Sequence, residues 1–262
     1  MIKFFRRIRQ QLLTENKFSP PKRRSRAGKY LLYAIGEIIL VVIGILIALQ
    51  INNLNESKKE QTLLNASLTS VKLNLQEDIE SLNAQINYNK SVLEAVDFSF
   101  RIISLPEYDD LPLSRFADSI FDVATESTFL PTTTAFNSME SGSHFQWIKD
   151  QDLTQAIYNY YALVDKISSL TSQNNQFVKN HMEGFTYNNM EFGSLLPNSN
   201  PYSKQRNPIL DNTKILREST VFENALIGRR FRAGGEIELS KDAILNAKEL
   251  ITTIDDYLND TN

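Results

Sequence analysis

The sequence predicts an all-α protein, with one N-terminal membrane-spanning helix followed by a helical bundle that is built on one long helix. Three observations predict this fold: a long apolar run at residues 30–51, a regular apolar stripe from residue 64 to residue 103, and further stripes at helical spacing in the C-terminal half. We therefore divide the chain into a basic tail (1–29), a membrane helix (30–51) and a helical domain (52–262).

The apolar run has the length and composition of a transmembrane helix. Fourteen of the 21 residues from 31 to 51 are Leu, Ile or Val, and Glu37 is the single charge. At 1.5 Å per residue the run spans roughly 31 Å, which matches a hydrocarbon core of about 30 Å. A cleaved signal peptide is the alternative, but its apolar region is usually about 7–15 residues long and ends in small residues. The longer run here ends in Leu49, Gln50 and Ile51, which favours an uncleaved anchor.

The charges on the two sides of this run predict its orientation. Residues 1–30 hold ten of the 28 Lys and Arg residues and one acid, whereas residues 52–262 hold 18 basic and 29 acidic side chains, a net charge of −11. The positive-inside rule places the N-terminus in the cytoplasm and the C-terminal domain on the other side of the membrane. The negative charge also argues against nucleic acid as a partner. The absence of cysteine excludes disulfides and thiolate chemistry.

The first 13 residues have the pattern of a short basic amphipathic helix, with Ile2, Phe5, Ile8 and Leu12 at helical spacing. One interpretation is that this helix lies on the inner leaflet. The other is that its charges only set the topology of the membrane helix.

One face of the membrane helix predicts a helix–helix contact within the lipid bilayer. Glu37, Val41, Gly44 and Ala48 share this face, and Gly44 with Ala48 forms a small-xxx-small pair that permits close approach of another helix. The expected partner is a second copy of the chain or another membrane protein. The alternative for Glu37 is that its side chain reaches the nearby interface or carries a proton.

The next segment, residues 52–105, contains no Gly or Pro and predicts one long helix. Its apolar residues follow an eleven-residue period, which keeps the stripe on one face of a nearly straight helix; they are Leu64, Leu68, Val71, Leu75, Ile79, Leu82 and Ile86, continued by Leu93, Val96, Phe100 and Ile103. The stripe is suited either to a coiled coil with sister chains or to later helices of its own chain. We favour the second arrangement, because later segments supply matching stripes.

Shorter helices are expected at residues 113–124 and 135–140, and a longer one starts at Asp150 or Asp152. The buried side of that longer helix is marked by Ile157, Tyr160, Tyr161, Val164, Ile167 and Leu170, and its pattern fades at residues 173–176. Two C-terminal helices are expected at 211–232 and 236–259, separated by Gly234 and Gly235.

Residues 184–210 contain two Gly, three Pro and several Asn residues, and predict an irregular connection. Its aromatic residues make it a candidate recognition loop, with Phe185, Tyr187, Phe192 and Tyr202 as the recognition residues. A partly ordered linker is the alternative.

Two stretches resemble a bacterial family known as domain of unknown function 6090. They are MIKFFRRIRQQLLTENKF with KYLLYAIGEIILVVIGILIALQINNLNE, and TAFNSMESGSHFQWIKDQDLTQAIYNYY at residues 134–161, which is similar to the family's turn before a helix that ends in paired tyrosines. The chain departs from the pattern by the inserted PPKRRSRAG, and by Met139, Glu140 and Phe145 in the turn. The resemblance implies a membrane-anchored architecture, here in a bacterial inner membrane with a periplasmic domain, and implies no activity.

No pattern of residues predicts catalysis, a metal site or a cofactor. The two histidines, His144 and His181, are 37 residues apart, and no Gly-rich phosphate loop or nucleophile elbow is present. We expect a protein without enzymatic activity, a membrane-anchored scaffold that binds another protein through its helical domain. The alternative is a periplasmic domain that senses a small molecule and signals through a partner protein.

Overall fold

The computed structural model describes residues 26–104, 113–204 and 208–260. All regular structure in these residues is helical, as the sequence predicted. The predicted amphipathic helix and most of the basic tail lie outside the described residues. The chain divides into two compact units, with the boundary between Lys59 and Glu60.

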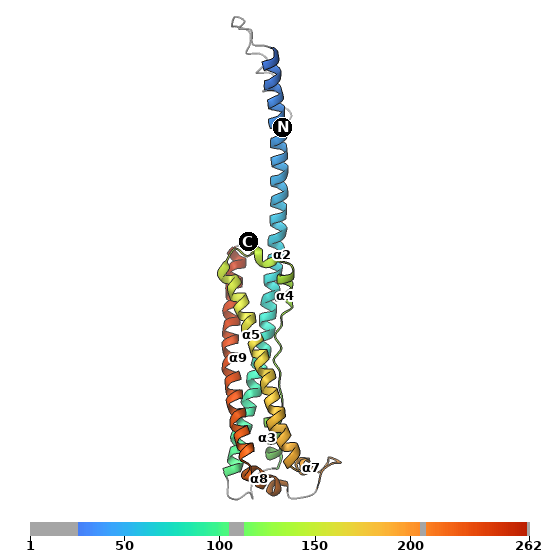
Figure 1. The fold of residues 1–262 in the computed structure, drawn as a ribbon, viewed down its shortest axis with the longest axis vertical. Helices are drawn as coiled ribbons and strands as arrows, with labels where there is room; N and C mark the ends of the chain where they lie inside the picture. Colours follow the sequence, from blue (N-terminus) through green and yellow to red (C-terminus); the bar gives the residue numbers. More distant parts are fainter. Residues whose placement is uncertain (1–25, 105–112, 205–207, 261–262) are drawn as a thin grey trace. The chain divides into compact units, whose positions relative to one another are not determined.

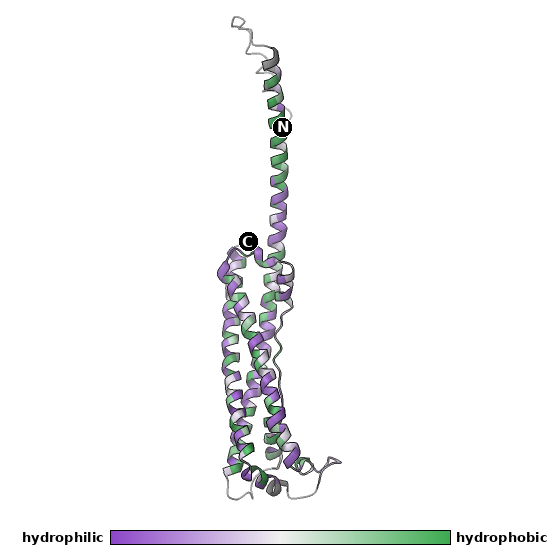
Figure 2. Ribbon diagram, viewed as in Figure 1, coloured by the Kyte–Doolittle hydropathy of each residue, from purple (hydrophilic) through white to green (hydrophobic). Residues whose placement is uncertain are grey.

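The first unit contains the N-terminal part of helix α2 (Arg26–Ser104). By length and composition, α2 is the one helix in the described residues that is suited to cross a membrane. Every described side chain between residues 30 and 59 is exposed. Figure 2 shows mostly hydrophobic residues along this part of α2 as far as residue 51, whereas hydrophobic and hydrophilic residues alternate along the helices of the second unit.

In the second unit, the C-terminal part of α2 lies beside two other long helices, α5 (Gln151–Phe177) and α9 (Thr220–Asp260) (Figure 1). Shorter helical segments cover this three-helix arrangement: α3 (Leu113–Ala124), α4 (Thr134–Ser141), the 3₁₀ helix η1 (His144–Trp147), the π-helical segment η2 (Val178–Glu183), α6 (Gly184–Asn189), α7 (Phe192–Leu195) and α8 (Pro208–Glu218).

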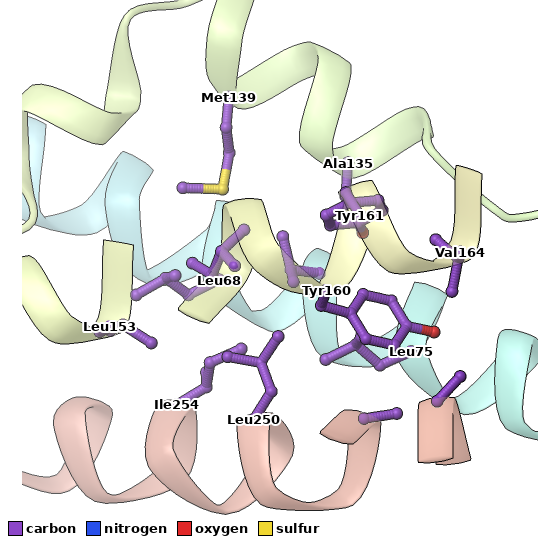
Figure 3. Close-up of a cluster of buried hydrophobic side chains, with 14 of the residues drawn as sticks. Leu68, Leu75, Ala135, Met139, Leu153, Tyr160, Tyr161, Val164, Leu250 and Ile254 are labelled. Carbon is purple, nitrogen blue, oxygen red and sulfur yellow. The ribbon is translucent and has the colours of Figure 1, made fainter. Parts of the chain in front are cut away.

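The predicted stripe of α2 packs inside its own chain. Leu68 and Leu75 of α2 meet Tyr160 of α5 and Leu250 and Ile254 of α9 in a first hydrophobic core, with Met139 of α4 above them (Figure 3). Beyond Ile86, Val96 is buried as predicted, but Val92 and Ile102 are buried in place of Leu93 and Ile103, which are half-buried. These later residues belong to a second core with Phe116 of α3 and Phe222 of α9.

Helix α5 begins where the sequence predicted and extends further than predicted. The Asp150 carboxylate caps it, because Oδ1 accepts hydrogen bonds from the backbone N–H groups of Asp152 and Leu153 at 2.8 and 3.2 Å. The helix does not fade at residues 173–176, since Asn174 is buried and bonded to Glu236 of α9. The tertiary contact stabilises a helix that local propensity leaves weak.

The region predicted as an irregular connection, residues 184–210, is more ordered than expected. It contains α6 and α7, and α8 begins at Pro208. Phe185 packs against Phe222 of the second core with ring centroids 5.0 Å apart, so burial of aromatic side chains accounts for the extra helical turns.

The predicted break at Gly234 and Gly235 is wrong, because α9 runs through both glycines. The chain breaks earlier, at Ser219, whose Oγ accepts a hydrogen bond from the Phe222 N–H at 3.2 Å and so caps α9. Buried residues on both sides of the glycine pair, including Ala233 and Ile237, hold the helix against the bundle. This packing outweighs the weak helix propensity of glycine.

We expect Gly234→Ala and Gly235→Ala each to raise the free energy of unfolding by about 1 kcal/mol, because alanine favours a helix interior by that amount. A Cβ added at either position meets no atom within 4 Å. Gly228→Ala in the same helix is the control, because its Cβ would lie 2.7 Å from Cζ of Phe177 and is expected to destabilise. Urea unfolding of the full-length protein in detergent, followed by circular dichroism, measures all three. A stabilising Gly228→Ala or a destabilising Gly235→Ala would contradict the helix geometry.

Candidate functional site

The segment that joins α3 to α4, residues 125–133, has no regular structure and runs beside α2 (Figure 1). Side chains of α2 bind its backbone at several points. The Asp78 carboxylate accepts from the Thr132 N–H at 2.7 Å, the Asn74 amide donates to the Thr132 carbonyl at 3.1 Å, and the Tyr88 hydroxyl donates to the Thr125 carbonyl at 2.6 Å. Backbone polar groups outside helices and strands need such partners when they pack against a core.

Helix α5 holds the same segment from another direction. The Asn175 Oδ1 accepts from the Ser127 N–H at 3.2 Å, and its amide nitrogen donates to Thr128 Oγ1 at 2.9 Å. The Ser127 hydroxyl in turn donates to Gln85 Oε1 of α2 at 2.7 Å. Side-chain hydrogen bonds from two helices therefore fix this segment along the bundle.

Asp78 is the most buried acid of this arrangement, with no exposed surface. Its second oxygen accepts from the Tyr160 hydroxyl at 2.9 Å. Burial raises the pKa of Asp78 above its ordinary value, against the lowering effect of its hydrogen bonds from Thr132 and Tyr160. Burial, together with the nearby Asp78 charge, also raises the pKa of Tyr160. The carboxyl group thus links α2, α5 and the segment before α4.

The raised pKa of Asp78 predicts a pH-dependent contribution to stability. Between the unfolded pKa of about 3.9 and the raised folded pKa, the folded state binds more protons than the unfolded chain. The free energy of unfolding that Asp78 contributes therefore falls as pH rises through this window. We expect Asp78→Asn to lose this part of the pH dependence in urea unfolding as pH rises above about 4.

The control for this measurement is Asp165→Asn, at an exposed site of α5. If Asp78→Asn and the wild type lose the same free energy of unfolding between low and high pH, the carboxyl group of Asp78 does not contribute in the way stated.

A second buried acid, Glu236 of α9, joins the three long helices. Its Oε2 accepts from the side-chain amides of Gln85 at 3.1 Å and Asn89 at 2.8 Å, both on α2, and its Oε1 accepts from the Asn174 amide of α5. Glu236 is 5% exposed. A buried carboxylate requires such donors, because an unpaired charge in the interior is strongly unfavourable.

Arg229 lies two helical turns before Glu236 and is 2% exposed. Its Nη2 donates to the Tyr88 hydroxyl at 2.6 Å and to the Thr125 carbonyl at 3.2 Å, and its guanidinium group lies 5.8 Å from the centre of the Tyr88 ring. The pKa of Tyr88 is raised, because the effect of burial exceeds the lowering effect of Arg229. Arg229 therefore binds the same segment that Asn74 and Asp78 hold.

These contacts hold the three long helices and the segment between α3 and α4 together. The two histidines lie in different surroundings: the His144 ring stacks on Trp147 and its Nδ1 is 2.8 Å from Ser67 Oγ, whereas His181 packs against Phe177. Among the residues that the structure describes, no group of three or more His, Asp or Glu side chains is placed to hold a metal ion.

A family model matches residues 37–181, more than half of the chain, and its description is a family of unknown function, DUF6090. The chain belongs to the DUF6090 family. No curated protein and no solved structure matches it. The DUF6090 region contains α2 from Glu37 onward, α3, α4 and α5, and therefore includes Asp78, Tyr160 and the segment between them. Helix α9, with Arg229 and Glu236, lies beyond the region that defines the family.

The paired tyrosines of the DUF6090 resemblance, Tyr160 and Tyr161, are both buried, as the sequence predicted. Their place in the structure supplies a physical reason for the pair: Tyr160 binds Asp78, and the Tyr161 ring stacks on Phe136 of α4 with centroids 4.4 Å apart. Met139, one of the departures from the family turn, fills a fully buried position in the first core.

The candidate membrane interface of Glu37, Val41, Gly44 and Ala48 lies on the first unit, where all four residues are exposed. A Cβ added at Gly44 meets no atom of the chain within 4 Å. The helix–helix contact of this face stays a prediction.

The four aromatic residues of the candidate recognition loop occupy different surroundings. Phe185 is half-buried and packs against the second core. Tyr187 is 69% exposed and stacks flat on Phe192, with ring centroids 5.0 Å apart, whereas Tyr202 is 79% exposed. Recognition by these four side chains stays a prediction. The Phe185 side chain has a structural role as well, because it packs against the second core.

Sequence reasoning missed the polar residues of the bundle interior: Asn74, Asp78, Gln85, Tyr88 and Asn89 on α2, Asn174 and Asn175 on α5, and Arg229 and Glu236 on α9. A signal was present on α2, because the first four recur at intervals of 4, 7 and 3 residues. Such spacing keeps them on one face beside the apolar stripe.

Proposed function

We propose that the chain is a single-pass protein of a bacterial inner membrane, with its N-terminus in the cytoplasm and its helical bundle in the periplasm. The bundle has no enzymatic activity and acts as a scaffold that binds another protein. The observation that carries this proposal is that every described apolar side chain between positions 30 and 51 is exposed. A surface this apolar is stable against lipid or against another apolar helix, and unstable in water.

The orientation in this proposal rests on charge. Ten basic residues precede the apolar run, and the domain that follows it has a net charge of −11. The positive-inside rule then places the tail in the cytoplasm.

Labelling of single cysteines tests the topology, because the chain has no cysteine of its own. With a membrane-impermeant maleimide on intact spheroplasts, Asn246→Cys at an exposed site of α9 should react, and Thr14→Cys in the tail should react only after lysis. Equal labelling of both sites before lysis, or release of the protein from membranes by alkaline carbonate, would contradict a single-pass anchor.

The scaffold role is favoured over small-molecule sensing because the two buried carboxylates, Asp78 and Glu236, bind groups of the chain itself. The Glu236 carboxylate accepts from three amides of the chain itself, and Asp78 accepts from Thr132 and Tyr160. A ligand in the interior would have to displace these bonds at considerable cost in free energy.

Crosslinking in intact cells, followed by pull-down in mild detergent, tests the helix–helix contact. We expect Gly44→Leu with Ala48→Leu to lose a partner that the wild type captures, because large side chains prevent close helix approach. Gly36→Leu makes the same kind of change on another side of the helix and is the control. Recovery of the bundle alone from every variant would contradict the scaffold and favour a search for small-molecule ligands by thermal shift.

A further inference from the structure

The second unit contains two hydrophobic cores that share α2 and α9, whereas α5 contributes to the first core and η2, which continues α5, contributes to the second. On α2 the buried residues of the first core end at Leu82, and those of the second core begin at Val92. Along α5 and η2 the corresponding residues are Ile167 and Val178, and on α9 they are Ala243 and Ala233. About ten residues on each helix therefore separate the first core from the second, which is roughly 15 Å at the helical rise.

Polar side chains occupy this gap on all three helices, and we call them the polar layer. Its buried members are Gln85 and Asn89 on α2, Thr171 and Asn174 on α5, and Glu236 and Ser240 on α9. The buried apolar residues at this level, Ile86 and Ile237, belong to neither core. Glu236 is the member that bonds to both other helices.

Two features of helix geometry lie where the polar layer meets the second core. On α5, the α-helix changes to the π-helical segment Val178–Glu183 four residues after Asn174. On α9, Gly234 and Gly235 immediately precede Glu236. π-Helical turns are rare and often mark functional positions, and glycine has a low helix propensity.

We propose that the polar layer is a conformational joint, at which the second core opens while the first core stays folded, and that Glu236 is the latch that keeps the joint closed. Opening at this level separates few apolar contacts, and water can replace the hydrogen bonds of the exposed amides and carboxylate. The second core is the half that opens, because short segments cover it: α3 has 12 residues, η2 six, α6 six, α7 four and α8 eleven.

Opening would expose apolar residues of the second core, such as Phe116, Val178 and Phe222. The joint is a property of the bundle alone and stands whether or not the chain is a scaffold.

Hydrogen exchange of the full-length protein in lipid nanodiscs, read by mass spectrometry, tests the joint. We expect amides of residues 92–102, 178–189 and 222–233 to exchange about tenfold or more faster than those of residues 64–82, 153–167 and 243–254, with the change at the polar layer. Uniform protection of both sets in the wild type would overturn the proposal.

Two variants separate the latch from general destabilisation. Glu236→Gln keeps the shape of the side chain and places an amide nitrogen opposite amide donors. Hydrogen exchange should therefore accelerate in the second-core residues (92–102, 178–189 and 222–233) and stay unchanged in the first-core residues. Replacing Gln85, Asn89, Asn174 and Glu236 together by Leu should join the two cores and bring the two rates to within about twofold. Equal acceleration of exchange in the first-core and second-core residues of Glu236→Gln would overturn the role of the polar layer. Exchange rates that still differ between the two cores in the fourfold variant would also overturn it.

Discussion

Asp78→Ala is expected to lower the free energy of unfolding of the helical bundle by about 3 kcal/mol, because it leaves two buried donors without an acceptor at roughly 1–3 kcal/mol each. These donors are the Thr132 N–H and the Tyr160 hydroxyl, which bind separate oxygens of the carboxyl group. Asp78 has no exposed surface, so water does not reach the two donors without local opening.

The adjacent acid supplies the control. Glu77 is exposed, and Glu77→Ala should change the free energy of unfolding by no more than about 0.5 kcal/mol. Urea unfolding of both variants in the same detergent measures the difference. If Asp78→Ala and Glu77→Ala were equally stable, the contacts of Asp78 with the segment before α4 would have no energetic role.

Leu68→Ala should cost about 2–5 kcal/mol, since it removes a fully buried side chain and leaves a cavity between three helices. Leu73→Ala on the same helix is the matched change, because Leu73 is 56% exposed and its loss should have an effect of at most about 0.5 kcal/mol.

This pair of variants tests whether the stripe of α2 packs within its own chain. Thermal unfolding over a tenfold or larger range of protein concentration separates the two arrangements, because an intermolecular coiled coil would make the melting temperature depend on concentration. A concentration-dependent loss in Leu68→Ala would contradict the packing of Leu68 against α5 and α9.

The sequence was most informative where apolar spacing determined the structure. Leu64, Leu68, Val71 and Leu75 recur at helical intervals, and all four are fully buried. Asp150 was a candidate cap, and its side chain does cap α5. In these places the local pattern and the tertiary packing favour the same structure.

Prediction failed where tertiary contacts override local propensity. Gly234 and Gly235 predict a break, but the buried residues around them hold α9 continuous. The Asn-rich end of α5 predicts fading, but Asn174 binds an acid 62 residues later. A single sequence does not reveal which polar side chains meet across such distances, and the interior positions of Asp78 and Glu236 follow from pairings between distant segments.

The arrangement of the three long helices also has a consequence for synthesis of the chain. Helix α9 supplies the last wall of both cores, and 156 residues separate the end of α2 at Ser104 from the end of α9 at Asp260. At about 5–20 residues per second, the ribosome needs roughly 8–30 s to make that stretch. During this time the apolar stripe of α2 has no α9 to cover it, so a newly made chain needs protection from aggregation until its last helix emerges.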